Sequence, residues 1–176
     1  MLLKEFTNKF VFSVSHTSRK IREGEKDGVN YHYTDKDIFL KMIESNGFVE
    51  WTQYNGNYYG TSKEELNNKK TYCDKNNCIC ILEIETVGAK NIHDLNIGSE
   101  FISILPPNID TLVERLHKRG TENEDQIKAR VEISKREIEE INKADFLKHK
   151  IINEKVDESY EQLKKMIFEM FPKTFN

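Results

Sequence analysis

Hydroxyl groups and arginines are concentrated between Phe12 and Tyr33, in the segment FSVSHTSRKIREGEKDGVNYHY. Within it, Ser15, Thr17 and Ser18 offer hydroxyl donors, and Arg19 and Arg22 offer two planar guanidinium groups. Such groups form charge-assisted hydrogen bonds with anions, and Gly24 and Gly28 allow the backbone to turn. The segment therefore predicts a cradle for an anion. A solvated surface loop with a hairpin turn at KDG is the alternative, because charged runs usually face solvent.

Two carboxylates, Glu83 and Glu85, come at the end of the apolar run CICILEIE. Because side chains alternate along a strand, we expect both on one face, at the carboxyl end of a buried parallel strand. This is where ligands bind in open α/β sheets. A buried carboxylate pair requires a cation or the donors of a ligand, such as Mg²⁺ or a nucleobase amine. A surface pair beyond the end of the strand is the alternative.

Glu50 and the tyrosines of NYYGT lie on either side of the pair Asn55-Gly56, which is a strong signal for a tight hairpin. A carboxylate, aromatic rings and hydroxyls that face one cavity suit guanine recognition, because the carboxylate accepts from the N1–H and the exocyclic amine. The tyrosine hydroxyls could then reach a phosphate. Aromatic residues at strand spacing also occur in ordinary cores, so both interpretations stay open.

Three arginines flank the start of a long charged segment, TENEDQIKARVEISKREIEEINKAD, at residues 121–145. They are Arg115, Arg119 and Arg130, and Arg119 directly precedes Gly120, where a hinge would begin. Phosphoryl transfer needs positive charge around the equatorial oxygens, and a closing helix with arginines can supply it. The segment is therefore interpreted as a lid. A solvated helix packed by one face accounts for most of the same composition.

The cysteines and histidines give no metal or nucleophile pattern. Cys73, Cys78 and Cys80 match no paired zinc-knuckle spacing, and two of them fall in the apolar run CICIL, where cysteine behaves as a small core residue. The five histidines are scattered along the chain. We expect reduced thiols without a metal.

The composition favours one helix-rich globular domain, since 32% of the 176 residues are charged, 37% are apolar, and Pro and Gly are few. The net charge of −3 gives no general attraction to nucleic acid or to an anionic membrane, so any anion site must be local. No apolar run approaches the ~20 residues of a membrane span, and MLLKEFTNKF lacks the features of a secretory signal. We expect a cytoplasmic monomer without nucleic-acid or membrane partners.

Apolar runs that alternate with helical periodicity predict an α/β fold, with a parallel sheet covered by helices. The runs are KFVFSV, CICILEI, FISIL and KIIN. Helices are predicted over residues 35–46, 109–118 and 157–171. Asn108 is the expected N-cap of the second helix and Gly120 its expected stop. Two regions depart from the alternation: residues 49–61 predict a small antiparallel lobe, and residues 121–145 a long exposed helix.

Six segments follow one another in the order and at the spacing found in guanylate kinases. They are FSVSHTSRKIREGEKDGVNYHY, FVEWTQYNGNYYGT, ILEIETVGAK, FISILPP, ERLHKRGTE and KIIN. The sequence therefore resembles the guanylate kinase family over nearly its whole length. The resemblance implies the reaction ATP + GMP → ADP + GDP with Mg²⁺, a step of purine nucleotide metabolism.

The resemblance also implies a role for each candidate residue. The GMP phosphate would be held by Ser15, Arg19, Arg22, Tyr31 and Tyr59. The guanine would be recognised by Glu50 and Thr61, with help from Glu85. The ATP side would comprise the catalytic lid arginines Arg119 and Arg130, Arg115 near the adenine, and Asn153 after the last core strand. Glu83 would bind the metal.

The implied fold is a single domain over residues 1–176 with a core sheet of the P-loop-kinase type, a small antiparallel GMP-binding lobe and a helical lid. The core comprises residues 10–15 and 78–117, the lobe 16–77, the lid 118–144, and the C-terminal strand and helix of the core 145–176. The division by apolar runs gives the same three parts.

Two features depart from the family pattern. The family has two aspartates at the positions of Glu83 and Glu85, and a glutamine at that of Val87, and a misplacement of ~1 Å at a reacting centre costs on the order of 10²-fold in rate. The Gly-rich P-loop, G-x-x-x-x-G-K-[ST], holds the ATP phosphates through its amides and lysine. Neither this motif nor the first core strand occurs in the 176 residues.

Three explanations of the missing motif are open. The chain is an N-terminally truncated copy of a kinase, a non-catalytic module that binds GMP or a phosphorylated peptide, or a protein whose missing strand comes from another polypeptide. We favour the first, because a pure binding module has no obvious use for the lid arginines. The sequence thus predicts retained GMP binding with weak or absent kinase activity.

Overall fold

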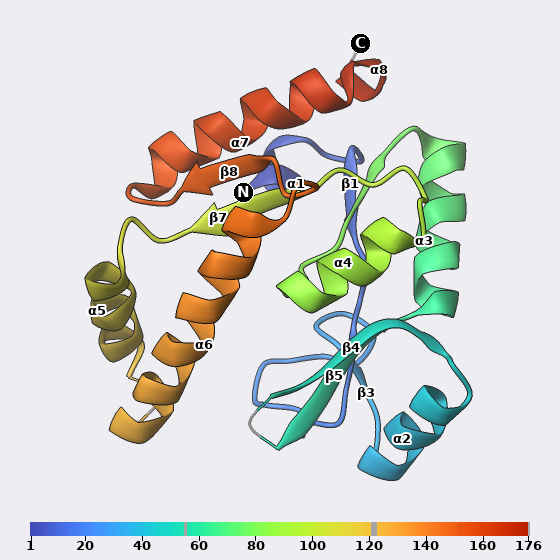
Figure 1. The fold of residues 1–176 in the computed structure, drawn as a ribbon. Coiled ribbons are helices and arrows are strands. Elements are labelled where there is room, and N and C mark those ends of the chain that lie inside the picture. The colour runs from blue at the N-terminus through green and yellow to red at the C-terminus, as the bar shows by residue number, and fades with distance from the viewer. Residues whose placement is uncertain (55, 121–122, 176) are drawn as a thin grey trace. The chain divides into compact units, whose positions relative to one another are not determined.

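The structure is a computed structural model that describes residues 1–54, 56–120 and 123–175. Its elements form two compact units, Met1–Ile97 with Lys173–Asn176, and Gly98–Pro172 (Figure 1). Each unit contains a two-stranded parallel ladder with helices, so the predicted α/β class is confirmed. The finer division into core, lobe and lid stays a prediction. Among the helices of the described residues, none combines the length and apolar character that a membrane crossing requires.

Parallel strands β1 (Phe10–Phe12) and β6 (Ile79–Ile81) form the ladder of the first unit, with Phe10 opposite Ile79 and Phe12 opposite Ile81. The short helices α1 (Leu2–Glu5) and α8 (Pro172–Phe175) lie at the two ends of the chain. The Phe175 ring lies 5.7 Å from the Phe6 ring and 5.8 Å from the Phe10 ring, between ring centroids. This aromatic cluster closes the core beside β1.

The second sheet of the first unit has the strand order β3-β2-β5-β4. Its strands are β2 (His16–Thr17), β3 (His32–Tyr33), β4 (Phe48–Tyr54) and β5 (Asn57–Ser62). The predicted antiparallel lobe is present, since β5 pairs antiparallel with both β2 and β4, but β2 and β3 are parallel. The chain does turn at KDG, where the Val29 N–H donates to the Lys26 carbonyl at 3.2 Å. This turn does not form the predicted hairpin, because the bridge between Asp27 and Tyr31 is parallel. Asn55 of the predicted hairpin turn lies outside the described residues.

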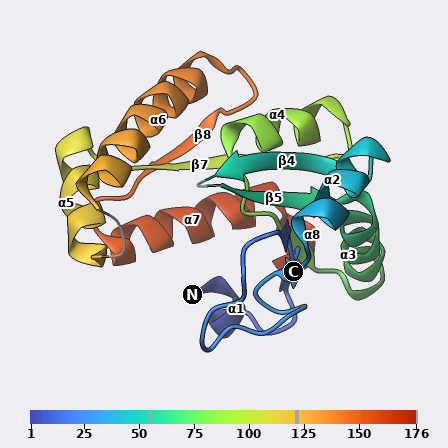
Figure 2. The same ribbon diagram turned by 90° about the horizontal axis from the view of Figure 1, so that it is seen from below.

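Three longer helices complete the first unit. Helix α2 (Lys36–Glu44) buries Phe39 completely, and the Phe39 ring stacks on that of Phe48 at 4.3 Å. Helices α3 (Lys63–Asn76) and α4 (Thr86–Asp94) were not predicted. Helix α4 runs along β4 (Figure 1, Figure 2). Cys73 at the end of α3 and Cys78 before β6 are buried with their sulfurs 3.1 Å apart, and burial raises the pKa of Cys73 to about 12.

The strand predicted to carry Glu83 and Glu85 ends earlier, at Ile81. The last backbone bond of the ladder runs from the Ser13 N–H to the Ile81 carbonyl, and the next N–H, of Val14, donates to the Glu65 carboxylate instead. Residues 82–85 therefore have no strand partner, and the expected alternation does not apply to them. Both carboxylates are exposed, so the buried pair is wrong and the alternative of a surface pair beyond the strand is right.

The second unit contains the parallel strands β7 (Ile102–Leu105) and β8 (His149–Ile152), with helix α7 (Val156–Met170) packed beside them (Figure 1). Helices α5 (Ile109–Arg119) and α6 (Glu124–Lys143) pack on each other. Their shared core consists of Leu116, Ile127 and Val131.

The predicted ends of α5 are confirmed. The Asn108 side chain accepts the Thr111 N–H at 2.8 Å, and Gly120 takes a left-handed conformation with φ +66°. The charged segment forms a helix as predicted, but α6 starts at Glu124, where Asn123 and Gln126 make a reciprocal capping box. The predicted start of this helix at Thr121 lies outside the described residues, as does Glu122.

Candidate functional site

Thr17 and Ser18, at the start of the predicted anion cradle, are hydrogen-bonded to Tyr58 of strand β5. The Thr17 hydroxyl, which is fully buried, donates to the Tyr58 carbonyl at 2.9 Å and accepts the Arg19 N–H at 3.1 Å. Ser18 exchanges two bonds with Tyr58, one from its N–H to the Tyr58 carbonyl and one from the Tyr58 N–H to its hydroxyl. These bonds hold the backbone at Arg19 in one place before the chain leaves the sheet.

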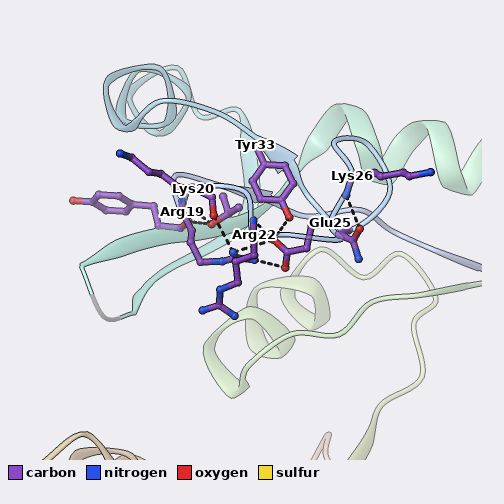
Figure 3. Close-up of polar contacts among 9 residues, drawn as sticks. Arg19, Lys20, Arg22, Glu25, Lys26 and Tyr33 are labelled. Atoms are coloured by element: carbon purple, nitrogen blue, oxygen red, sulfur yellow. Dashed lines mark hydrogen bonds and ion pairs between the residues drawn. The ribbon is translucent and has the colours of Figure 1, made fainter. Parts of the chain in front are cut away.

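Arg19 is paired with Glu25, a residue that the sequence analysis did not single out (Figure 3). The Nη1 group donates to Glu25 Oε2 at 3.0 Å and the Nη2 group to Glu25 Oε1 at 2.8 Å. Nη1 also donates to the Lys20 carbonyl at 2.9 Å. The Arg19 and Glu25 side chains are only 12% and 20% exposed, so both are largely shielded from water.

The Glu25 carboxylate collects two further donors. The Arg22 N–H donates to Oε2 at 2.8 Å, and the Tyr33 hydroxyl donates to the same oxygen at 2.7 Å. The bonds from Arg19, Tyr33 and Arg22 together lower the pKa of Glu25 to about 2. Glu25 and Tyr33 are site residues that the sequence analysis missed, because the turn of residues 20–24 brings Glu25 to Arg19 and the pairing of β3 with β2 brings Tyr33 there.

Two tyrosine rings lie near the Arg19 guanidinium. Its central carbon lies 5.4 Å from the centre of the Tyr31 ring and 5.8 Å from that of Tyr33. Tyr31 also contacts Tyr59, with 5.9 Å between ring centroids. Burial raises the pKa of Tyr31, so its hydroxyl is a donor at neutral pH. Three residues predicted to hold the phosphate, Arg19, Tyr31 and Tyr59, thus lie together, while Arg22 nearby has an exposed side chain.

Glu50 and Thr61 face each other across strands β4 and β5. The Thr61 N–H donates to Glu50 Oε1 at 2.7 Å, and the Thr61 hydroxyl lies 3.4 Å from that of Ser15. Glu50 is 7% exposed, and this burial raises the pKa of its carboxyl. A Cβ on Gly88 of helix α4 would lie only 3.0 Å from Glu50 Oε2, so the glycine lets α4 approach the carboxylate closely.

The two exposed carboxylates beyond β6 act electrostatically on these same groups. The charge of Glu85 contributes to the raised pKa of Glu50, and that of Glu83 to the raised pKa of Tyr31. Within the described part of the chain, no group of three or more His, Cys, Asp or Glu side chains could hold a metal ion. Mg²⁺ commonly takes only one or two carboxylates together with substrate phosphates and water, and an exposed Glu83 fits that donor set.

The remaining predicted residues lie in the second unit. Arg115 of α5 donates from Nη2 to the Glu154 carbonyl at 3.0 Å, next to Asn153. Asn153 follows β8, and its side-chain oxygen is buried with no hydrogen-bond partner among the described residues. Arg119 is exposed at the end of α5, and Arg130 is half-buried in α6. The candidate residues for GMP and for ATP therefore divide between the two units.

Comparison with known proteins identifies the family. The sequence profile described as Guanylate kinase matches residues 1–170. The chain belongs to the guanylate kinase family. A guanylate kinase of Schizosaccharomyces pombe is 39% identical over 162 residues, which are 92% of this chain and 78% of that protein. A guanylate kinase of Sus scrofa is 33% identical, over 98% of this chain and 85% of that protein. The resemblance read from the sequence is therefore confirmed.

Two further guanylate kinases are similar to this chain. One matches over a smaller part of its own length, and the other is a solved structure of low sequence identity. Guanylate kinase 1 of Oryza sativa is 37% identical over 94% of this chain, and the chain spans 42% of that protein. The crystal structure of guanylate kinase from Anaplasma phagocytophilum superposes with a TM-score of 0.72, covering 97% of this chain and 80% of that one. At 24% sequence identity, this match supports the guanylate kinase fold and no more.

Proposed function

We propose that this chain binds GMP through its first unit and has weak or no activity in the guanylate kinase reaction, ATP + GMP → ADP + GDP. The observation that carries the proposal is the grouping of the acceptor residues in one unit. A shielded arginine lies among tyrosines, and a buried carboxylate lies on the adjoining strands of the same sheet. Family membership supports the same ligand.

The phosphate of GMP would bind to Arg19, with Tyr31 and Tyr59 as hydroxyl donors. Two or three charge-assisted bonds at ~1.5–3 kcal/mol each would supply a large share of the binding free energy. Ser15 and Arg22 are the further donors that the resemblance assigns here. Aromatic rings that exclude water around the guanidinium strengthen each of these bonds.

The guanine base would bind to the Glu50 carboxylate, which accepts from the N1–H and the exocyclic amine. Glu50 already receives one N–H from Thr61 at Oε1, and Oε1 and Oε2 have further lone pairs for donors of a base. Burial disfavours the charged form of the Glu50 carboxyl, so donors from guanine would relieve that cost. Thr61 and Glu85 are the residues that would support this recognition.

Phosphoryl transfer would involve the second unit. An oxygen of the GMP phosphate attacks the γ-phosphorus of ATP in line, and the bond to the ADP oxygen breaks. Arg119 and Arg130 would supply positive charge to the phosphates, Arg115 and Asn153 would contact the adenine side, and Glu83 would hold Mg²⁺. Bound Mg²⁺ neutralises charge on the transferred phosphoryl group. Without the G-x-x-x-x-G-K-[ST] motif in these residues, we expect slow transfer.

Calorimetry with GMP, AMP and guanosine tests the binding proposal, and a coupled assay of ADP release tests catalysis. We expect saturable binding of GMP, weaker binding of guanosine and none of AMP. Turnover at ordinary kinase rates of ~1–100 s⁻¹ would contradict the expected loss of activity. Binding of a phosphorylated peptide that GMP displaces, and that Arg19→Ala abolishes, would favour the binding module instead. A monomeric state in the cytoplasm remains a prediction.

A further inference from the structure

We propose that Glu25 is a positioning residue of the phosphate site: it holds the Arg19 guanidinium by one edge and leaves the other edge free for a phosphate. This inference rests on the proposed function, in which Arg19 binds the phosphate of GMP. Glu25 itself would not touch the ligand. Its carboxylate would act through Arg19, whose direction it fixes before the ligand arrives.

The hydrogen bonds of Arg19 define which edge is in use. A guanidinium group carries five N–H donors, two on Nη1, two on Nη2 and one on Nε. Both donors of Nη1 are taken, by the Lys20 carbonyl and by Glu25 Oε2, and one donor of Nη2 is taken by Glu25 Oε1. Beyond these bonds, the Tyr33 hydroxyl also interacts with the Arg19 side chain. No geometric hydrogen bond among the described residues uses the Nε–H or the second Nη2 donor. These two point to the same side and match the spacing of two phosphate oxygens.

Glu25 also sets the conformation of the loop that carries the second predicted arginine. Its carboxylate accepts the Arg22 N–H at 2.8 Å, while the Glu25 N–H donates to the Arg22 carbonyl at 3.1 Å. The Tyr33 hydroxyl ties the same oxygen to strand β3 at 2.7 Å. One carboxylate therefore joins the end of β2, the loop and β3 (Figure 3).

The contacts also argue against the opposite role, in which Glu25 imitates the phosphate and must leave before GMP can bind. A carboxylate in the place of the ligand would collect the side chains of both predicted arginines. Arg22 instead offers Glu25 only its backbone N–H, and Arg19 keeps a bidentate edge unused. The bond from the Tyr33 hydroxyl further anchors Glu25 to the sheet. Glu25 is thus a fixed part of the site and does not have to move before a phosphate binds.

Titration calorimetry on Glu25→Gln tests the role, with GMP and guanosine as the two ligands. Glutamine has the same size but accepts at only one oxygen, so Arg19 loses one of its two bonds and its opposite charge. We expect GMP affinity to fall about tenfold and guanosine affinity to stay unchanged, because guanosine has no phosphate. Glu23→Gln is the matched control, with the same charge change at an exposed position of the same loop, and should leave both affinities unchanged.

Tyr33→Phe provides a second measurement if Glu25→Gln does not fold. It removes one hydrogen bond to Glu25 and should weaken GMP binding about threefold, with guanosine again unaffected. Unchanged or tighter GMP binding in either variant overturns the positioning role. So does an equal loss for GMP and guanosine, which would show a general structural effect. If the unmodified chain fails to bind GMP, the proposed function itself fails, and that result is separate from all of these.

Discussion

The first unit and the second unit organise their candidate residues in different ways. In the first, the candidate side chains have partners: Arg19 is paired with Glu25 and lies near the Tyr31 and Tyr33 rings, and Glu50 accepts the backbone N–H of Thr61. In the second, Arg119 and Arg130 sit on separate helices, α5 and α6. The comparison indicates that the residues proposed to bind GMP are preorganised within their own unit. Substitutions in the two units should therefore affect the proposed GMP and ATP sites separately.

The physical reason lies in what holds each set of residues. The residues proposed to bind GMP lie on or beside a four-stranded sheet, where backbone ladders fix each position relative to its neighbours. A largely shielded guanidinium and a buried carboxylate also need partners, since unpaired charges are costly away from water. An exposed arginine at a helix end, such as Arg119, has no such requirement because water solvates it. Its side chain is therefore not held in one geometry by the fold.

Arg19→Ala should have the largest effect and tests whether the two units act separately. Loss of two charge-assisted bonds at ~1.5–3 kcal/mol each weakens GMP binding on the order of 10²-fold or more. Arg119→Ala should leave the Kd for GMP alone within about twofold, because its surface position lies in the other unit. Calorimetry without ATP measures both. Equal losses of GMP affinity in the two variants would contradict the separate behaviour of the two units.

Glu50→Gln should weaken GMP binding next most strongly. The glutamine amide presents an N–H donor where guanine needs an acceptor, so two buried donors face each other without a hydrogen bond. One such mismatch lowers the affinity for GMP by ~10-fold to 10²-fold. Guanosine should lose as much as GMP, since the change affects the base and not the phosphate. Glu44→Gln, an exposed glutamate at the end of α2, is the matched control. A loss confined to GMP would contradict the assignment of Glu50 to guanine.

The pH dependence of guanosine binding is a further test of whether Glu50 binds the guanine base. Burial raises the pKa of Glu50 above 4.5, so this carboxyl takes up its proton at a higher pH than an ordinary glutamate. The protonated group no longer accepts both donors of guanine. Affinity should therefore be constant near neutral pH and fall as the pH drops through the raised value, by up to ~tenfold per pH unit. Guanosine avoids titration of the phosphate, and Glu50→Gln should give a flat profile.

Gly120→Ala should have the smallest effect, confined to the stability of the chain. Gly120 has φ +66°, a conformation that costs an alanine about 1 kcal/mol, although no atom within 4 Å obstructs its Cβ. The free energy of unfolding in urea should fall by that amount. The Kd for GMP should not change, because the residue belongs to the second unit. A shift in GMP affinity would show that the acceptor site depends on the end of α5.

Strands β1, β6, β7 and β8 were predicted from their apolar runs, although β6 ends before Glu83, and the two-residue strands β2 and β3 were missed because they contain no apolar run. Helix α3 was missed because it buries only Leu66 and Cys73, too few apolar residues for a clear periodicity. Helix α4 was missed because Gly88 argues against a helix from sequence alone. In the structure, Gly88 lies against the Glu50 side chain, where a larger residue would come too close. The glycine that lowers the local helix propensity is therefore required for the packing of α4.

The sequence by itself determined the family, the α/β class and the residues with the right chemistry for an anion and a guanine base. Residue type and spacing carry that information directly. Only the tertiary structure decided which carboxylates are buried: Glu50 is, while Glu83 and Glu85 are exposed. It also decided that Arg19 pairs with Glu25. Burial and ion pairing depend on segments that meet only after folding, so no local pattern could have specified them.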